Sequence, residues 1–155
     1  FSYDIRADIQ NLARKNLQQL GLEERVTLKT KDIRDGFDEN EADALFLDLP
    51  NPFDYIEQVA KALKPGGNFG TILPTTNQVQ KLLSALNSHH FGFLEVCEIL
   101  IRYYRPFADK LRPTDRMVAH TGYLVFARPT LAESSSPISI PQSSATDLEE
   151  PTPDE

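Results

Sequence analysis

Hydrophobic positions along the chain change repeatedly between a helical spacing and a strand spacing. Between residues 7 and 20 the apolar side chains recur every three or four positions, which predicts an amphipathic helix that Gly21 ends. Residues 25–30 alternate apolar and polar side chains, as a strand with one buried face does. The same patterns predict the remaining elements, with strands at 1–5, 44–47, 68–73, 93–104 and 121–127, and helices at 53–63 and 77–87.

This alternation of strands and helices predicts an α/β fold with a mostly parallel, doubly wound sheet. The last two predicted strands follow each other without a helix, so we expect them to form a C-terminal antiparallel hairpin. Residues 1–128 are predicted to form this domain. Residues 129–155 are rich in serine, proline and acidic side chains, and we expect them to be disordered because they offer little apolar surface to bury.

The net charge of −7 over 155 residues is concentrated at the C-terminal end of the chain. Residues 131–155 carry six acidic and no basic side chains, whereas the preceding 130 residues carry 17 acids and 16 bases. The predicted domain is therefore nearly neutral. Its charge does not exclude a nucleic-acid partner.

Several classes of protein are excluded by composition. The apolar runs are too short to span a bilayer, and no segment resembles a signal peptide, so we expect no membrane partner. The single cysteine, Cys97, excludes an internal disulfide, and the three scattered histidines predict no metal site. The chain begins at Phe1 and its one methionine is Met117, so we expect it to be processed or part of a longer protein.

Three acidic residues each follow a predicted strand: Asp4, Asp32 and Asp48. If these strands are parallel neighbours, the three carboxylates meet at one edge of the sheet, where α/β folds bind ligands. One acid there can accept both ribose hydroxyls of a nucleoside, and another can accept from an adenine amino group. The alternative is structural, because acids are also common at strand ends and as helix N-caps.

Asp48 lies at the end of a short apolar run and is followed by Pro50 and Pro52, which prevent the strand from continuing. A carboxylate on such a stiff turn can accept a hydrogen bond from an exocyclic amine or take up a proton. Asp48 or Asn51 could equally cap the next helix. The residue types alone leave the two interpretations evenly matched.

Residues 102–116 combine five basic side chains with the aromatic residues Tyr103, Tyr104 and Phe107. Basic side chains interleaved with aromatic rings suit RNA binding, because the charges can contact phosphates and the rings can stack on an unstacked nucleobase. A solvated surface loop is the alternative, and charge alone favours it.

Motifs spread over most of the chain resemble the bacterial and archaeal tRNA (adenine-58-N1)-methyltransferases. The opening Tyr-Asp-Ile-Arg is similar to that family's second motif, and four later segments follow in the family's order, at residues 47–53, 63–67, 74–79 and 112–124. The resemblance extends from residue 1 to about residue 128. It implies a Rossmann-like class I methyltransferase that uses S-adenosylmethionine, methylates N1 of a T-loop adenine in tRNA, and is a cytoplasmic homotetramer.

The resemblance also assigns roles to individual residues. Asp4 matches the acid that holds the cofactor ribose, Asp32 the acid beside the cofactor adenine, and Asp48 the catalytic acid against the target adenine. Asp48 and Leu49 are further expected along the cofactor. The expected substrate-binding residues are Pro50, Phe53, Asn77, Gln78, Arg112, Arg116, His120 and Thr121. The chain departs from the family by having Asp4 for the more common Glu, and Phe53 for Trp.

A larger departure is that the family's first strand and glycine-rich loop have no counterpart in the chain. We therefore expect a sheet that lacks its central strand, with open edges that can pair with another copy, and poor binding of S-adenosylmethionine by this chain alone. Two alternatives remain. One is a non-catalytic RNA-binding or oligomerising module on the same fold, and the other is a small-molecule α/β enzyme, since a fold alone does not determine function.

Overall fold

The computed structural model describes residues 1–114 and 122–131. Two parallel strands, β1 (Ser2–Asp4) and β2 (Leu28–Thr30), flank the helix α1 (Ala7–Gln19) and form a small sheet of their own. A second sheet has the strand order β3-β4-β8-β5. Its strands are β3 (Ala42–Leu47), β4 (Leu63–Leu73), β5 (Phe91–Cys97) and β8 (Tyr123–Pro129), and its helices are α2 (Ile56–Ala62) and α3 (Thr76–Ser88).

The four-stranded sheet combines parallel and antiparallel pairing. Strand β3 pairs parallel with β4, whereas β8 runs antiparallel to both β4 and β5. The expected antiparallel pairing of the last two long strands is confirmed. Its second strand extends to Pro129 and its first ends at Cys97, earlier than predicted.

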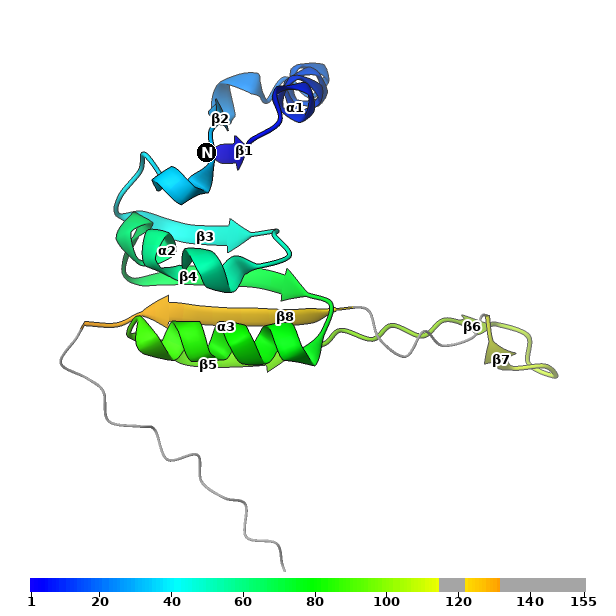
Figure 1. The fold of residues 1–155 in the computed structure, drawn as a ribbon. Coiled ribbons are helices and arrows are strands. Elements are labelled where there is room, and N and C mark those ends of the chain that lie inside the picture. The colour runs from blue at the N-terminus through cyan, green and yellow to red at the C-terminus, as the bar shows by residue number, and fades with distance from the viewer. Residues whose placement is uncertain (115–121, 132–155) are drawn as a thin grey trace, which may run out of the picture.

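Residues 98–114 leave the sheet and form a projecting arm (Figure 1). The arm carries a short antiparallel ribbon of β6 (Tyr104–Arg105) and β7 (Arg112–Pro113), with Arg105 paired opposite Arg112. Residues 98–104 were predicted to continue the strand because their apolar side chains fit a strand pattern. The spacing of apolar residues does not reveal whether a segment has a neighbouring strand with which to pair.

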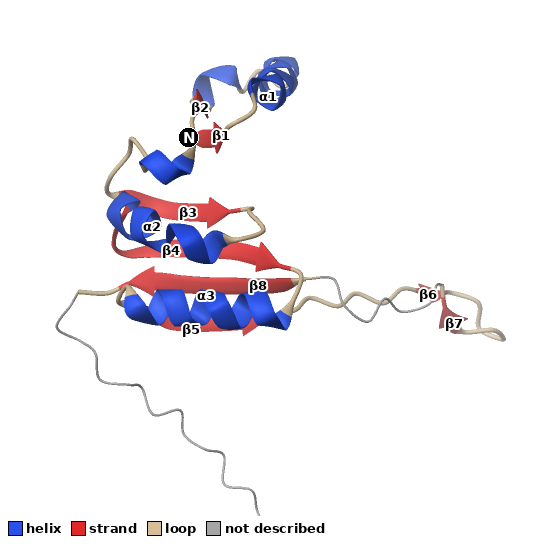
Figure 2. Ribbon diagram, viewed as in Figure 1, coloured by secondary structure: helices blue, strands red, loops and turns tan. Residues whose placement is uncertain are grey.

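Helices α2 and α3 lie on one face of the four-stranded sheet (Figure 2), and the hydrophobic core lies between these helices and the sheet. Ile56, Val59, Leu82 and Leu86 from the helices pack against inward side chains such as Phe69, all at most 1% exposed. The opposite face of the sheet carries large apolar side chains that no other described part of the chain buries, among them Phe46, Ile72 and Phe126.

Strand β4 begins five residues earlier than predicted. Leu63 already pairs with Ala42, after which the register shifts before Asn68 pairs with Ala44. The Lys-Pro-Gly-Gly segment does end α2, as predicted, but it forms an irregularity within the strand in place of a separate turn. Gly66 has a φ of 75°, which lets the chain bend there at little cost.

Helix α1 has few apolar neighbours on the face that the sequence pattern predicted to be buried. Leu12 and Leu20 are 55% and 71% exposed, and the only buried side chain of the helix is Gln10. Its amide nitrogen donates to the carbonyls of Ser2 and Lys29, so it ties the helix to both β1 and β2. Two short strands offer too narrow a surface to cover a whole amphipathic helix.

The sheet is interrupted between β1 and β3, as the resemblance predicted. Each of these strands pairs on one side only, β1 with β2 and β3 with β4, and no described strand joins the two sheets. Two open strand edges therefore face the space between the sheets. No helix in the described part of the chain is long and apolar enough to cross a membrane.

Candidate active site

A cavity of about 710 Å³ occupies the space between β1 and β3. The segment 1–6 forms one wall, and β3 with the following Asp48 and Leu49 forms the other. Residues 31–34, which follow β2, also line it. Asp4, Asp32 and Asp48 therefore border one cavity, so residues distant in the sequence are brought to a single site. A cavity bordered by carboxylates at the ends of parallel strands has the character of a nucleoside site.

Asp4 and Asp32 occupy similar turns. The Asp4 carboxylate accepts a hydrogen bond from the backbone N–H of Arg6 at 2.8 Å, and the Asp32 carboxylate accepts one from that of Arg34 at 2.9 Å. Asp32 is also the N-cap of a 3₁₀ turn, η2 (Ile33–Asp35), so the capping interpretation holds for this residue. In each case the bond engages one carboxylate oxygen.

The Asp-Ile-Arg sequence occurs at both of these turns, at residues 4–6 and 32–34, and both arginines line the cavity. The Arg6 and Arg34 guanidinium nitrogens lie 3.7 and 3.9 Å from their respective aspartates. Sequence reasoning singled out the acids and missed these arginines. The repeated tripeptide after two predicted strands was the signal that could have identified them.

Asp48 differs from the other two acids because its carboxylate has no hydrogen bond or ion pair with any described residue. It caps no helix in the described part of the chain. The 3₁₀ turn η3 (Pro52–Tyr55) has Asn51 as its N-cap, and α2 has Tyr55. Neither side chain accepts a capping hydrogen bond from the helix backbone, and the Asn51 amide donates instead to the Asp54 carboxylate at 2.6 Å. Asp48 is exposed and lines the cavity, so its carboxylate is available to a ligand.

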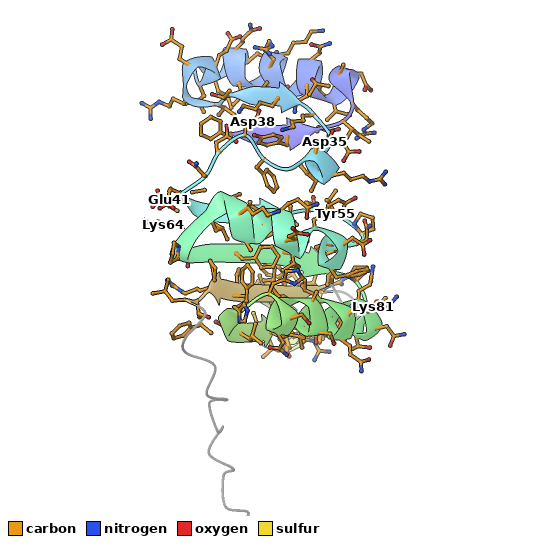
Figure 3. All side chains as sticks on the ribbon, turned by 60° about the vertical axis from the view of Figure 1, so that its left-hand side comes forward. Asp35, Asp38, Glu41, Tyr55, Lys64 and Lys81 are labelled. Atoms are coloured by element: carbon orange, nitrogen blue, oxygen red, sulfur yellow. The ribbon has the colours of Figure 1, made fainter. Side chains whose placement is uncertain are left out.

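The turn after Asp48 is packed against α3. Gln78 donates from its side-chain amide to the Pro50 carbonyl at 2.9 Å, and the Lys81 ammonium lies 5.5 Å from the centre of the Phe53 ring. Figure 3 labels Lys81 on α3. Asn77 is exposed in the first turn of α3. This turn and the helix beside it therefore contain four of the residues that were expected to bind substrate: Pro50, Phe53, Asn77 and Gln78.

An ionic cluster lies at the β1 side of the cavity, where its members Tyr3, Lys31 and Glu39 line the wall. Lys29 pairs with Glu39 and with Asp38 at 3.0 Å, Lys31 pairs with Asp38 at 2.5 Å, and the Tyr3 hydroxyl donates to Glu39. Hydrogen bonds from Lys31 and Lys29 lower the pKa of Asp38, and the bond to Glu39 is the main reason that the pKa of Lys29 is raised. The cluster anchors residues 36–41 beside the β1–β2 pair, where Figure 3 places Asp38.

The remaining predicted substrate residues are not brought to the cavity in the described structure. Arg112 is exposed on the β6–β7 ribbon of the projecting arm, away from both sheets (Figure 1). Arg116, His120 and Thr121 lie outside the described residues. Among the residues that are described, no group of three His, Cys, Asp or Glu side chains could hold a metal ion.

Comparison with known proteins identifies the family. The model of the family described as tRNA methyltransferase complex GCD14 subunit matches residues 1–111. The tRNA (adenine(57)-N(1)/adenine(58)-N(1))-methyltransferase TrmI of Methanocaldococcus jannaschii is 33% identical over 153 residues, covering 82% of this chain and 54% of the relative. The tRNA (adenine(58)-N(1))-methyltransferase TrmI of Thermus thermophilus is 29% identical over 128 residues, covering 82% of this chain and 50% of the relative.

Solved structures agree with this assignment. A Thermotoga maritima protein described as a SAM-dependent O-methyltransferase has a TM-score of 0.79 and 51% identity, covering 84% of this chain and 49% of that one. The tRNA (m1A58) methyltransferase TrmI of Aquifex aeolicus has a TM-score of 0.73 and 40% identity, covering 82% and 51%. The chain thus spans about half the length of the relatives it matches. Both the Rossmann-like methyltransferase fold and the resemblance inferred from the motifs are confirmed: the chain belongs to the tRNA methyltransferase complex GCD14 subunit family.

Proposed function

We propose that the protein containing this chain methylates N1 of adenine 58 in tRNA, with S-adenosylmethionine as the methyl donor. The observation that carries the proposal is the convergence of Asp4, Asp32 and Asp48 on one cavity, with the Asp48 carboxylate unpaired among the described residues. Relatives named as tRNA adenine-N1 methyltransferases support the choice of substrate.

In this proposal the cofactor nucleoside lies along the carboxyl ends of β1 and β2. Asp4 accepts from the ribose hydroxyls, Asp32 lies beside the cofactor adenine, and Leu49 lies along the cofactor. In Asp4 and in Asp32 the backbone N–H of the turn donates to only one carboxylate oxygen, so the other oxygen can accept a hydrogen bond from a ligand. When bound, S-adenosylmethionine supplies an electrophilic methyl group on its sulfonium.

Asp48 is the proposed catalytic residue. Transfer of the methyl group to adenine N1 would leave the adenine ring cationic. A carboxylate beside that ring stabilises the developing positive charge and can accept the N6 proton. Its position at the cavity, on a turn stiffened by Pro50 and Pro52, suits this role.

The tRNA would contact the turn at Pro50 and Phe53, the exposed Asn77 beside it, and the segment containing Arg112, Arg116, His120 and Thr121. Arg112 lies with Arg102 and Arg105 on a projecting arm, which suits phosphate contacts at a distance from the cavity. We further propose that the protein is cytoplasmic and assembles as a homo-oligomer, a tetramer as in the family.

A second candidate is methylation of an oxygen acceptor, because the 51% identical Thermotoga structure is described as an O-methyltransferase. The non-catalytic binding module is not favoured, because the similar proteins are named as methyltransferases. The two remaining candidates differ in the atom that receives the methyl group, which a direct assay can identify.

The test uses the full-length product of the gene and the chain 1–155 in parallel. Each is titrated with S-adenosylmethionine by calorimetry and incubated with a tRNA transcript, and the modified nucleoside is then mapped by mass spectrometry. We expect N1-methyladenosine at position 58 from the full-length product. We expect little cofactor binding by the chain 1–155, because the sheet beside its cavity is interrupted. Methylation of an oxygen, or a full-length product that does not bind the cofactor, would overturn the proposal.

A further inference from the structure

Two side chains from different elements hold the backbone on either side of Asp48. Thr71 of β4 donates from its hydroxyl to the carbonyl of Leu47, the residue before Asp48, at 2.6 Å. Gln78 of α3 donates from its amide to the carbonyl of Pro50, two residues after Asp48, at 2.9 Å. The peptide that carries Asp48 and Leu49 is thus held at both ends.

Thr71 lies where the pairing of β3 with β4 ends. Leu47 and Thr71 are the last residues paired between these two strands, and Thr71 is completely buried. Its hydroxyl is therefore an additional link at the point where the chain leaves the sheet. A buried hydroxyl is normally retained only where it makes such a bond, because an apolar side chain of the same shape is easier to bury.

Gln78 is held in its orientation by Thr75, the N-cap of α3. The Thr75 hydroxyl donates to the side-chain oxygen of Gln78 at 2.6 Å and accepts from the Gln78 backbone N–H at 3.4 Å. With its oxygen engaged, the Gln78 amide directs its NH₂ group at Pro50. Both polar ends of this half-buried side chain are therefore used within the protein.

We propose that Thr71 and Gln78 are positioning residues that set the location of the Asp48 carboxylate, and that Gln78 does not bind substrate. Because that carboxylate has no partner of its own among the described residues, its place depends on the backbone that carries it. The proposal rests on the proposed function of Asp48. Small displacements of a reacting group have large effects on rate, on the order of 100-fold for about 1 Å.

The kinetic test uses Thr71→Val, Thr71→Ser, Gln78→Ala and, as a matched control, Gln80→Ala on the exposed side of α3. In the full-length product we expect Thr71→Val and Gln78→Ala to lower kcat about 10- to 100-fold. The KM for tRNA and the Kd for S-adenosylmethionine should change less than about twofold. Thr71→Ser, which keeps the hydroxyl, and Gln80→Ala should behave as the wild type does.

A second measurement does not depend on activity. In the chain 1–155, amide hydrogen exchange at residues 48 and 49 should accelerate in Thr71→Val and Gln78→Ala, relative to exchange in the core strands, and not in the two control variants. A Gln78→Ala variant with raised KM and unchanged kcat would make Gln78 a substrate contact and overturn the inference, as would unchanged exchange. A wild-type enzyme that does not methylate adenine would instead overturn the proposed function, and the exchange data would still test the two hydrogen bonds.

Discussion

At the scale of single residues, three aspartates that border the same cavity have different surroundings. Asp4 and Asp32 each accept a hydrogen bond from the backbone N–H two residues later, so part of their role is to shape their own turns. Asp48 makes no such bond to any described residue and is exposed at the cavity. Its conformation is determined by neighbours of its backbone. Replacing it should therefore affect chemistry more than folding.

We accordingly expect Asp48→Ala to abolish tRNA methylation by the full-length product, a loss of at least about 100-fold, while cofactor binding stays largely intact. Methyl transfer to a tRNA transcript and calorimetric titration with S-adenosylmethionine measure the two effects. Asp43→Ala is the matched control, because Asp43 lies near the opposite end of β3 and pairs with Lys64 at the surface. Full activity in Asp48→Ala would remove Asp48 from the mechanism.

At the scale of elements, the wall of the cavity depends on an ionic cluster that joins β1, β2 and residues 36–41. Hydrogen bonds from Lys31 and Lys29 lower the pKa of Asp38 below its usual 3.8. Burial tends to raise the pKa of Glu39, but hydrogen bonds from Lys29 and Tyr3 outweigh it and lower that pKa below 4.5. The carboxylates of folded Asp38 and Glu39 are thus harder to protonate than those of the unfolded chain.

This direction gives the pH dependence of the cluster. A group whose pKa is lowered by folding stabilises the fold fully above its unfolded value, so the contribution is complete above about pH 4.5 and is lost as the pH falls through the lowered values. Lys29→Met should return the pKa of Glu39 and Asp38 toward normal and loosen residues 36–41. Carboxyl titration by NMR measures the shift. Lys64→Met, whose partner is Asp43, should leave both values unchanged, and unshifted titrations in Lys29→Met would contradict the assignment.

At the scale of the whole molecule, the last described residues mark how far the folded body extends toward the C-terminus. The buried core extends from Leu47 to Ala127. Beyond it, Pro129 still pairs with Phe91, and Thr130 donates from both its backbone N–H and its hydroxyl to the carbonyl of His90. These contacts extend the body slightly past the boundary predicted at residue 128.

We expect a chain ending at Leu131 to unfold thermally at the same midpoint as the chain 1–155. A chain ending at Ala127 loses the end of β8 and both Thr130 bonds, which together contribute about 2 kcal/mol. Its midpoint should fall by roughly 5–10 °C. Circular dichroism melts of the three chains measure the difference. A lower midpoint for the chain ending at Leu131 would mean that residues 132–155 contribute to the folded body.

The sequence by itself determined the type and approximate place of the main helices and strands, the three acids at strand ends, and the family. The elements and the acids depend on neighbours within a few positions, such as the period of apolar residues, Gly21 after a helix, or Pro50 and Pro52 after a strand, and the family follows from the order of such local motifs along the chain. Such local signals do not require knowledge of which segments meet.

Only the tertiary structure decided which segments meet. It brought Asp4, Asp32 and Asp48 to one cavity and directed the Gln78 amide to Pro50. It also placed Arg112 on the projecting arm, away from that cavity, although Arg112 and the aspartates that line the cavity belong to motifs of the same family. These outcomes depend on strand order and on hydrogen bonds between residues more than twenty positions apart. No local pattern encodes them, because a side chain's final partner is set by the packing of the whole domain.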